Sequence, residues 1–234
     1  MLTYQLIAFT ILMFVGVVFY TKKFTNKQNK AIRIGMAIFL LGCETLYQIF
    51  TFLSGKYDVT FDLPLHLCSV MVILSGIALL FNWEKVLNVL VLPLVGGPIL
   101  ALLMPFTPEN SPLIRDIYYF GYHVGLISVA MFTVWVNRIQ LSKTMIFKSS
   151  LFTLVLGLVS LWYNGITGGN YVFTVEPIAF EAFFVNHPIL YKVTLQVFIT
   201  ADMTIVYGLF ALSLKFTPSS FKVRLPQYSK KTTV

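Results

Sequence analysis

Residues 2–23 read LTYQLIAFTILMFVGVVFYTKK, and this stretch decides the class of fold. The run from Leu2 to Tyr20 contains no charged side chain and approaches the roughly 20 apolar residues that a helix needs to cross a bilayer core. Lys22 and Lys23 follow the run, and no basic residue precedes it, which is the reverse of a signal peptide. The pattern predicts a retained membrane helix with its N-terminus outside and its basic flank in the cytoplasm.

The composition of the whole chain favours the same class of protein. Of its 234 residues, 57% are hydrophobic and only 11% are charged, too few charges to solvate the surface of a water-soluble domain of this length. The same composition excludes disordered, collagen-like and coiled-coil classes. Two cysteines cannot form a disulfide framework. We therefore expect an all-α polytopic membrane protein.

Six further apolar stretches follow the first one. No linker rich in Ser, Gly or Pro divides the chain, and no repeat of 20 to 50 residues occurs, so residues 1–234 are expected to form a single integral membrane domain. A basic tail, 214–234, is expected to lie in the cytoplasm. The seven predicted transmembrane helices span about 2–20, 32–53, 63–82, 86–104, 117–137, 147–164 and 191–213.

The basic residues agree with seven spans, N-terminus outside and C-terminus cytoplasmic. In this topology only Lys56, Arg115 and Lys192 of the 17 basic residues lie outside, as the positive-inside rule requires. Losing or adding one span would exchange the sides of all later loops and remove this bias. The net charge of +8 is therefore interpreted as an anchor to anionic lipid at the cell membrane. It does not indicate nucleic-acid binding, because no groove-reading motif accompanies it.

Two features interrupt the helical pattern. Pro93 and the Gly96-Gly97-Pro98 segment are expected to break the fourth span, which frees carbonyl groups that neighbouring helices must satisfy. In the long loop before the last span, residues 177–184 are expected to form a short helix in the headgroup layer.

Polar side chains at membrane depth are few, and each is costly enough to be a functional candidate. Their positions favour one polar cavity that opens toward the outside. The alternative is that the acids and their neighbours form hydrogen bonds that only hold the helices together. The candidates are Glu44, Gln48, His66, Cys68, His123, Asn164, Gln196 and Asp202.

Several chemistries are excluded by missing residues or motifs. The last span carries lysines only at its ends, so a retinal Schiff base is excluded. Neither zinc spacing of Cys and His, nor a phosphate-binding Gly-rich loop, nor a Gly-x-Ser-x-Gly elbow occurs. We expect no cofactor and no metal ion.

The segment Asp62-Leu63-Pro64-Leu65-His66-Leu67-Cys68 stands out. Pro64 is expected to begin the third helix. His66 and Cys68 then differ by about 200° around the helix, so His123 of the fifth span is the better partner for the thiol. A thiolate activated by an imidazole is a route to covalent acyl transfer. The alternative is that Cys68 and the histidines serve packing.

Several segments between about residues 60 and 177 resemble the seven-helix family that includes the bacterial membrane protein YwaF and the eukaryotic transmembrane protein 164. The resemblance implies a phospholipid acyltransferase in which Cys68 carries the acyl group, His123 is its base and His66 orients or stabilises charge. The segments are Leu63-Pro64-Leu65-His66-Leu67-Cys68, Leu102-Leu103-Met104-Pro105, Tyr118-Tyr119-Phe120-Gly121-Tyr122-His123, and Asn170-Tyr171-Val172-Phe173 with Glu176-Pro177.

Two functional hypotheses follow, and membrane lipids are the expected partners in the first. The first is an enzyme that transfers an acyl chain between bilayer lipids or to water through Cys68 and His123. The second is a proton-coupled small-molecule transporter or a membrane sensor that uses Glu44, Asp202 and the histidines in an outward cavity. Catalysis requires the Cys68 sulfur near an imidazole, whereas transport requires central acids and a path inward.

Overall fold

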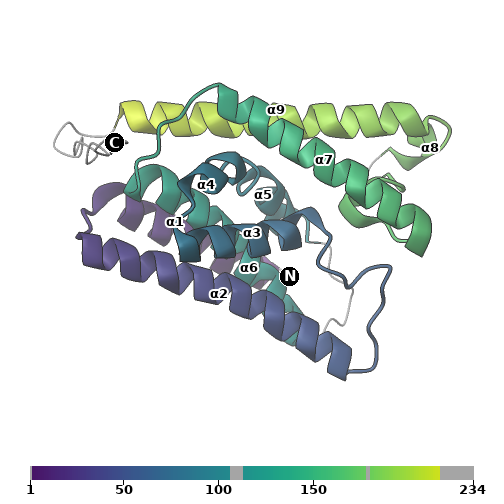
Figure 1. Cartoon of the computed structure of the whole chain (residues 1–234), viewed down its shortest axis with the longest axis horizontal. Helices are drawn as coiled ribbons and strands as arrows, with labels where there is room; N and C mark the ends of the chain where they lie inside the picture. Colours follow the sequence, from purple (N-terminus) through teal and green to yellow (C-terminus); the bar gives the residue numbers. More distant parts are fainter. Residues whose placement is uncertain (1, 106–112, 178–179, 217–234) are drawn as a thin grey trace, which may run out of the picture.

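The computed structural model describes residues 2–105, 113–177 and 180–216. Within these ranges every regular element is helical, so the predicted all-α class is confirmed (Figure 1). The elements are α1 (Leu2–Thr21), α2 (Asn26–Leu53), α3 (Leu67–Phe81), α4 (Glu84–Leu90), α5 (Gly96–Leu103), α6 (Leu113–Met131), the π-helix η1 (Phe132–Val136), α7 (Thr144–Thr167), the 3-10 helix η2 (Tyr171–Phe173), α8 (Glu181–Phe184) and α9 (Pro188–Lys215).

Five helices in the described part of the chain are long and apolar enough to cross a membrane: α1, α2, α6 with η1, α7 and α9. The third predicted span is shorter than expected, because α3 has 15 residues and rises only about 22 Å against a bilayer core of about 30 Å. Pro64 does not begin this helix. Residues 63–66 lie in the preceding loop, and His66 is the extended N-cap residue of α3. Of the short helix expected at 177–184, α8 forms at Glu181–Phe184, and residues 178–179 lie outside the described ranges.

The predicted break in the fourth span is confirmed, since α4 ends at Leu90 and α5 begins at Gly96. Pro93 has no N–H group, so the carbonyl of Val89, four residues earlier, loses its helical donor. Ser149 of α7 replaces that donor, with its Oγ donating to the Val89 carbonyl oxygen at 2.6 Å. A neighbouring helix thus satisfies the carbonyl that the proline frees.

Pro105, at the other end of the broken segment, also frees a carbonyl group that a side chain of another helix satisfies. It removes the donor for the carbonyl of Ala101, and the hydroxyl of Tyr119 on α6 donates to that oxygen at 3.0 Å. Gln5 of α1 donates to the next carbonyl, that of Leu102, at 3.0 Å. At both prolines, therefore, side chains from other helices donate to the carbonyl groups that lack a helical donor.

The broken α4–α5 segment lies in the core of the molecule (Figure 1). Val91, Leu92 and Leu94 at the break are fully buried. Helix α2 packs on α3 and α6, α1 packs on α6, and α7 packs on α9. Large apolar side chains such as Phe14, Leu53 and Trp162 point outward, 70%, 77% and 68% exposed, as expected for faces in contact with lipid.

Candidate functional site

Cys68 lies in the first turn of α3, two residues after the N-cap His66. The first hydrogen bond of this helix runs from the Val70 N–H to the His66 carbonyl oxygen at 3.0 Å. The N–H groups of residues 67–69 therefore have no acceptor within the helix. Such an end carries partial positive charge, and it stabilises a thiolate or another anion that forms beside it.

The surroundings of Cys68 come from α6. Cys68 packs against the buried core that contains Tyr122, and the Tyr122 ring lies 4.0 Å from the ring of His123, centroid to centroid. His123 is buried, and its Nδ1 donates to the Tyr119 carbonyl oxygen at 2.7 Å. Among the described residues no hydrogen bond joins the Cys68 thiol to His66 or His123. Cys68 and His123 therefore do not form a direct pair in this state.

His66 is engaged with the loop in front of it. Its Nε2 lies 3.1 Å from the Phe61 carbonyl oxygen, to which it donates. Its ring lies 4.8 Å from the ring of Tyr171 and 5.2 Å from that of Phe61. In this state the imidazole supports the backbone that leads into α3.

Glu44 and Gln48 belong to an acid–tyrosine cluster that supports the same loop. Glu44 is buried, and its two carboxylate oxygens accept from the Tyr118 hydroxyl at 2.7 Å and from Gln48 Nε2 at 2.9 Å. Gln48 Nε2 also donates to the backbone carbonyl of Asp62 at 2.9 Å. The cluster consists of Glu44, Tyr47, Gln48, Tyr57, Asp62 and Tyr118.

The carboxylate of Asp62 closes the cluster. It accepts from the Tyr47 hydroxyl at 3.0 Å and from the backbone N–H of Asp58 at 2.8 Å. The rings of Tyr47 and Tyr118 stack with centroids 4.1 Å apart. Because α3 is short, irregular backbone precedes it, and these side chains satisfy that backbone as a membrane environment requires.

Asn164, at the end of α7, reaches the loop through Tyr171. Its side-chain amide forms two hydrogen bonds of 2.9 Å with the backbone of Tyr171. The Tyr171 hydroxyl in turn donates to the Val59 carbonyl at 2.9 Å and accepts from the Leu63 N–H at 3.1 Å. Burial raises the pKa of Tyr171 to about 12, so this hydroxyl stays protonated and can donate.

Gln196 and Asp202 have other partners. Gln196 of α9 donates from Nε2 to the backbone carbonyl and hydroxyl of Ser150 on α7, both at 3.1 Å. The carboxylate of Asp202 packs against Gly96, in the space that a Cβ atom would occupy. The structure therefore joins Glu44 with Gln48 and links Asn164 to the same loop, whereas Gln196 and Asp202 serve the contacts of α9 with α7 and α5.

Three residues that support the loop were not selected from the sequence: Asp62, Tyr118 and Tyr171. Tyrosine is common in an aromatic-rich chain, so nothing in its position marks these two as hydrogen-bonding groups. Asp62 directly precedes Leu63-Pro64, and its place just before the apolar run of the third predicted span was the one available signal.

The described helices are long and apolar, and their outward faces are apolar as well. Side chains of neighbouring helices satisfy the carbonyl groups that the prolines free. These features define a multi-pass membrane protein. A family model described as the TMEM164 family matches residues 1–207, and the chain belongs to that family. This confirms the resemblance seen in the sequence. No curated protein and no solved structure matches the chain.

Proposed function

We propose that this protein is a lipid acyltransferase or transacylase in which Cys68 is the nucleophile and His123 its base. The observation that carries the proposal is the position of the thiol in the first turn of α3, beside N–H groups that no helical carbonyl uses. Nucleophilic cysteines use this location because the helix end stabilises negative charge. The resemblance of the segment around Cys68 to the family signature supports the same assignment.

The proposed reaction has two steps. His123 takes the thiol proton, the sulfur attacks the ester carbonyl of a lipid, and the ester C–O bond breaks as the leaving lyso-lipid oxygen takes the proton back. A hydroxyl of a second lipid, or water, then attacks the thioester and restores the thiol. In this proposal the N–H groups of residues 67–69 stabilise the oxyanion of each step. Because no hydrogen bond joins Cys68 to His123, lipid binding must bring the two side chains together.

A thiol-reactive lipid ester tests the proposal on protein purified with native lipids. We expect the wild type to form a hydroxylamine-sensitive acyl adduct and Cys68→Ser to form none. Cys43→Ser is the matched control, because Cys43 is also free and partly buried, and it should label like the wild type. His123→Ala should slow labelling about a hundredfold. The exposed His187 provides the control His187→Ala.

Equal labelling of Cys68→Ser and wild type would contradict the proposal. Intrinsic tryptophan fluorescence should be unchanged in each variant, which separates lost chemistry from lost fold. A variant of His123 that labels at the rate of the His187 variant would remove His123 from the base role while leaving Cys68 as the nucleophile.

The arrangement of the acids favours the enzyme over the proton-coupled transporter or sensor. Both oxygens of Glu44 accept hydrogen bonds from side chains that support the loop before α3. Asp202 lies against Gly96 in the contact of α9 with α5. The two acids therefore have separate structural partners, where a transport site requires them to face one path.

We further propose that the chain passes the cell membrane seven times, with its N-terminus outside and its C-terminus in the cytoplasm. In this topology α3 with its loop is the third pass, and α4 with α5 is one broken pass. The α1–α2, α3–α4 and α6–α7 connections lie at one end of the molecule, and the α2–α3 connection lies at the other (Figure 1). The first set carries the basic residues of the inner loops.

Thiol labelling in intact cells tests this topology. Lys56→Cys and Lys143→Cys, each in a Cys43→Ser, Cys68→Ser background, place one exposed thiol in loops at opposite ends. A reagent that cannot cross the bilayer should label position 56 before cell lysis and position 143 only after it. Labelling of position 143 in intact cells would overturn the proposed orientation.

A further inference from the structure

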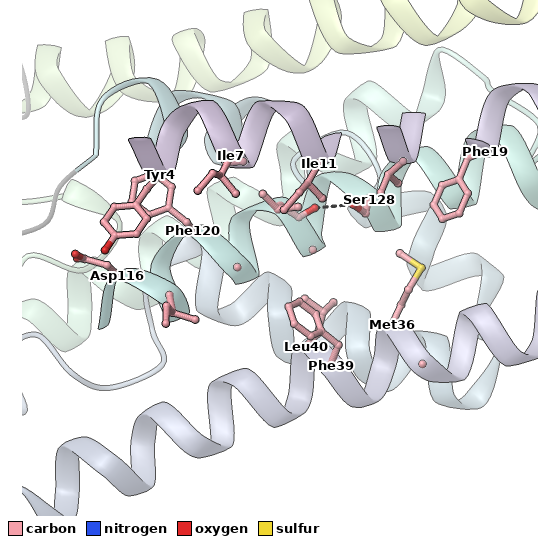
Figure 2. A pocket seen from close by; sticks show the side chains of 17 residues that line it. Tyr4, Ile7, Ile11, Phe19, Met36, Phe39, Leu40, Asp116, Phe120 and Ser128 are labelled. Atoms are coloured by element: carbon pink, nitrogen blue, oxygen red, sulfur yellow. Dashed lines mark hydrogen bonds between the residues drawn. The ribbon is translucent and has the colours of Figure 1, made fainter. Parts of the chain in front are cut away.

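A long apolar groove runs between α1 and α2 along α6, away from the acid–tyrosine cluster. The two helices leave their short connection and diverge, and α6 forms the floor between them (Figure 2). The groove has a volume of about 610 Å³, in the range of small-molecule sites. Tyr4 and Asp116 lie at one end, and Phe19 and Met36 lie at the other.

The walls of the groove are suited to hydrocarbon. Ile7, Ile11 and Phe39 line it and are 52%, 45% and 47% exposed. The Ser128 hydroxyl needs no acceptor from a ligand in the groove, because it donates to the Val124 carbonyl of its own helix at 2.8 Å. Gly35 leaves open space, since no atom lies within 4 Å of the position that its Cβ would take. Water gains little in such a groove, whereas an apolar chain that fills it makes van der Waals contacts with these side chains along its length.

The length of the groove matches one leaflet. From Asp116 to Ser128 the floor rises by twelve helical steps of α6, about 18 Å in all. Half of a bilayer core is about 15 Å thick. A lipid chain that lies along α6 therefore reaches from the end of the groove to the middle of the membrane.

The polar end of the groove lacks a hydrogen-bond donor. The Oδ1 atom of Asp116 is buried and has no hydrogen-bond partner among the described residues, although Asp116 lines the groove. A buried acceptor without a donor is costly, so a ligand that supplies an N–H or O–H group gains affinity by pairing with it. Figure 2 shows Asp116 beside Tyr4, at the end where a headgroup would lie above a chain in the groove.

We propose that this groove binds one acyl chain of a membrane lipid whose headgroup or glycerol donates a hydrogen bond to Asp116. The groove is apolar over the length of one leaflet, which suits the acyl chain. It ends at the unpaired Asp116 carboxylate oxygen, which suits a polar group that donates a hydrogen bond. Cys68 is not among the lining residues, so the proposal goes beyond the acyl-transfer chemistry and does not depend on it.

Photo-crosslinking tests the chain site. The full-length protein is placed in nanodiscs of phosphatidylcholine and phosphatidylethanolamine that contain a trace of either lipid with a diazirine in its acyl chain. Crosslinks should map to peptides of α1, α2 and α6. Gly35→Leu should reduce them at least fivefold, because the new side chain fills the groove without a clash. Gly157→Leu on α7 is the matched control, since its Cβ position is also open and lies outside the groove, and it should leave the yield unchanged.

The headgroup contact has its own readout. In the wild type, the diazirine lipid with an ethanolamine headgroup should crosslink more than the choline lipid, because only ethanolamine has an N–H donor. Asp116→Leu should abolish this preference and retain crosslinking by both. Diazirine lipids with a glycerol headgroup show whether an O–H donor is accepted as well as an N–H donor.

Several results would overturn the proposal. These are equal yields in Gly35→Leu and wild type, a preference for ethanolamine that survives Asp116→Leu, or crosslinks that map outside the peptides of α1, α2 and α6. Cys68→Ser should crosslink like the wild type, so a failure of the acyltransferase proposal is seen separately from a failure of the groove.

Discussion

Replacing Glu44 by leucine should lower the midpoint of thermal unfolding in detergent by roughly 6–12 °C, the equivalent of about 3 kcal/mol for a chain of this size. The carboxylate accepts from Tyr118 at 2.7 Å and from Gln48 at 2.9 Å, and leucine offers neither oxygen. Both donors then lose this acceptor inside the protein. Because Gln48 also holds the Asp62 carbonyl, the loss should extend to the loop before α3. The loss of tryptophan fluorescence with temperature measures the midpoint.

Two variants complete this experiment. Glu44→Gln keeps one side-chain oxygen at nearly the same volume, so it should recover part of the loss. Glu84→Leu changes the same residue type at an exposed position in the first turn of α4 and should shift the midpoint little. A Glu44→Leu protein as stable as Glu84→Leu would show that the acid–tyrosine cluster does not hold the loop.

Ser149→Ala should destabilise the protein by about 1–3 kcal/mol, because the carbonyl of the half-buried Val89 would be left without a donor. Val89 needs the Ser149 donor because Pro93 has no N–H group, so the destabilisation by Ser149→Ala should depend on that proline. In the double variant with Pro93→Ala, the new N–H at position 93 can donate to Val89, and most of the stability should return. Unfolding midpoints of the wild type, the two single variants and the double variant form the cycle.

Ser160 offers a matched control on the same helix. Its hydroxyl is as buried as that of Ser149 but finds no hydrogen-bond partner in the part of the chain that the structure describes. Ser160→Ala should therefore be neutral or slightly stabilising, since it removes an unpaired polar atom. Equal losses at positions 149 and 160, or a double variant no better than Ser149→Ala, would show that the Val89 contact does not compensate for the proline.

The candidate site illustrates how far residue type and spacing can predict. Polarity at membrane depth marked Glu44, Gln48, His66 and Asn164 as functional candidates, and each of them forms specific hydrogen bonds, because an unsatisfied polar group is costly in that environment. Their partners could not be predicted. Tyr118 lies 74 residues from Glu44, and no local pattern connects them.

The start of α3 shows the same limit. Pro64 permits a helix to begin at residue 64, and local preference alone would start it there. The structure instead keeps 63–66 irregular, because His66, Gln48 and Tyr171 satisfy the backbone of this loop from other elements. Cys68 is thereby moved from inside the predicted helix to its first turn, which is the position on which the proposed chemistry depends.

The amino-acid sequence by itself determined the membrane class, the long apolar helices, the break at Pro93 and the family, since hydrophobic runs and proline act locally along the chain. Only the tertiary structure decided which side chains satisfy the freed carbonyls, how the loop before α3 is supported and where a groove opens between α1 and α2. These features arise from groups far apart in sequence, whose distances are set by how the helices pack and not by the order of residues.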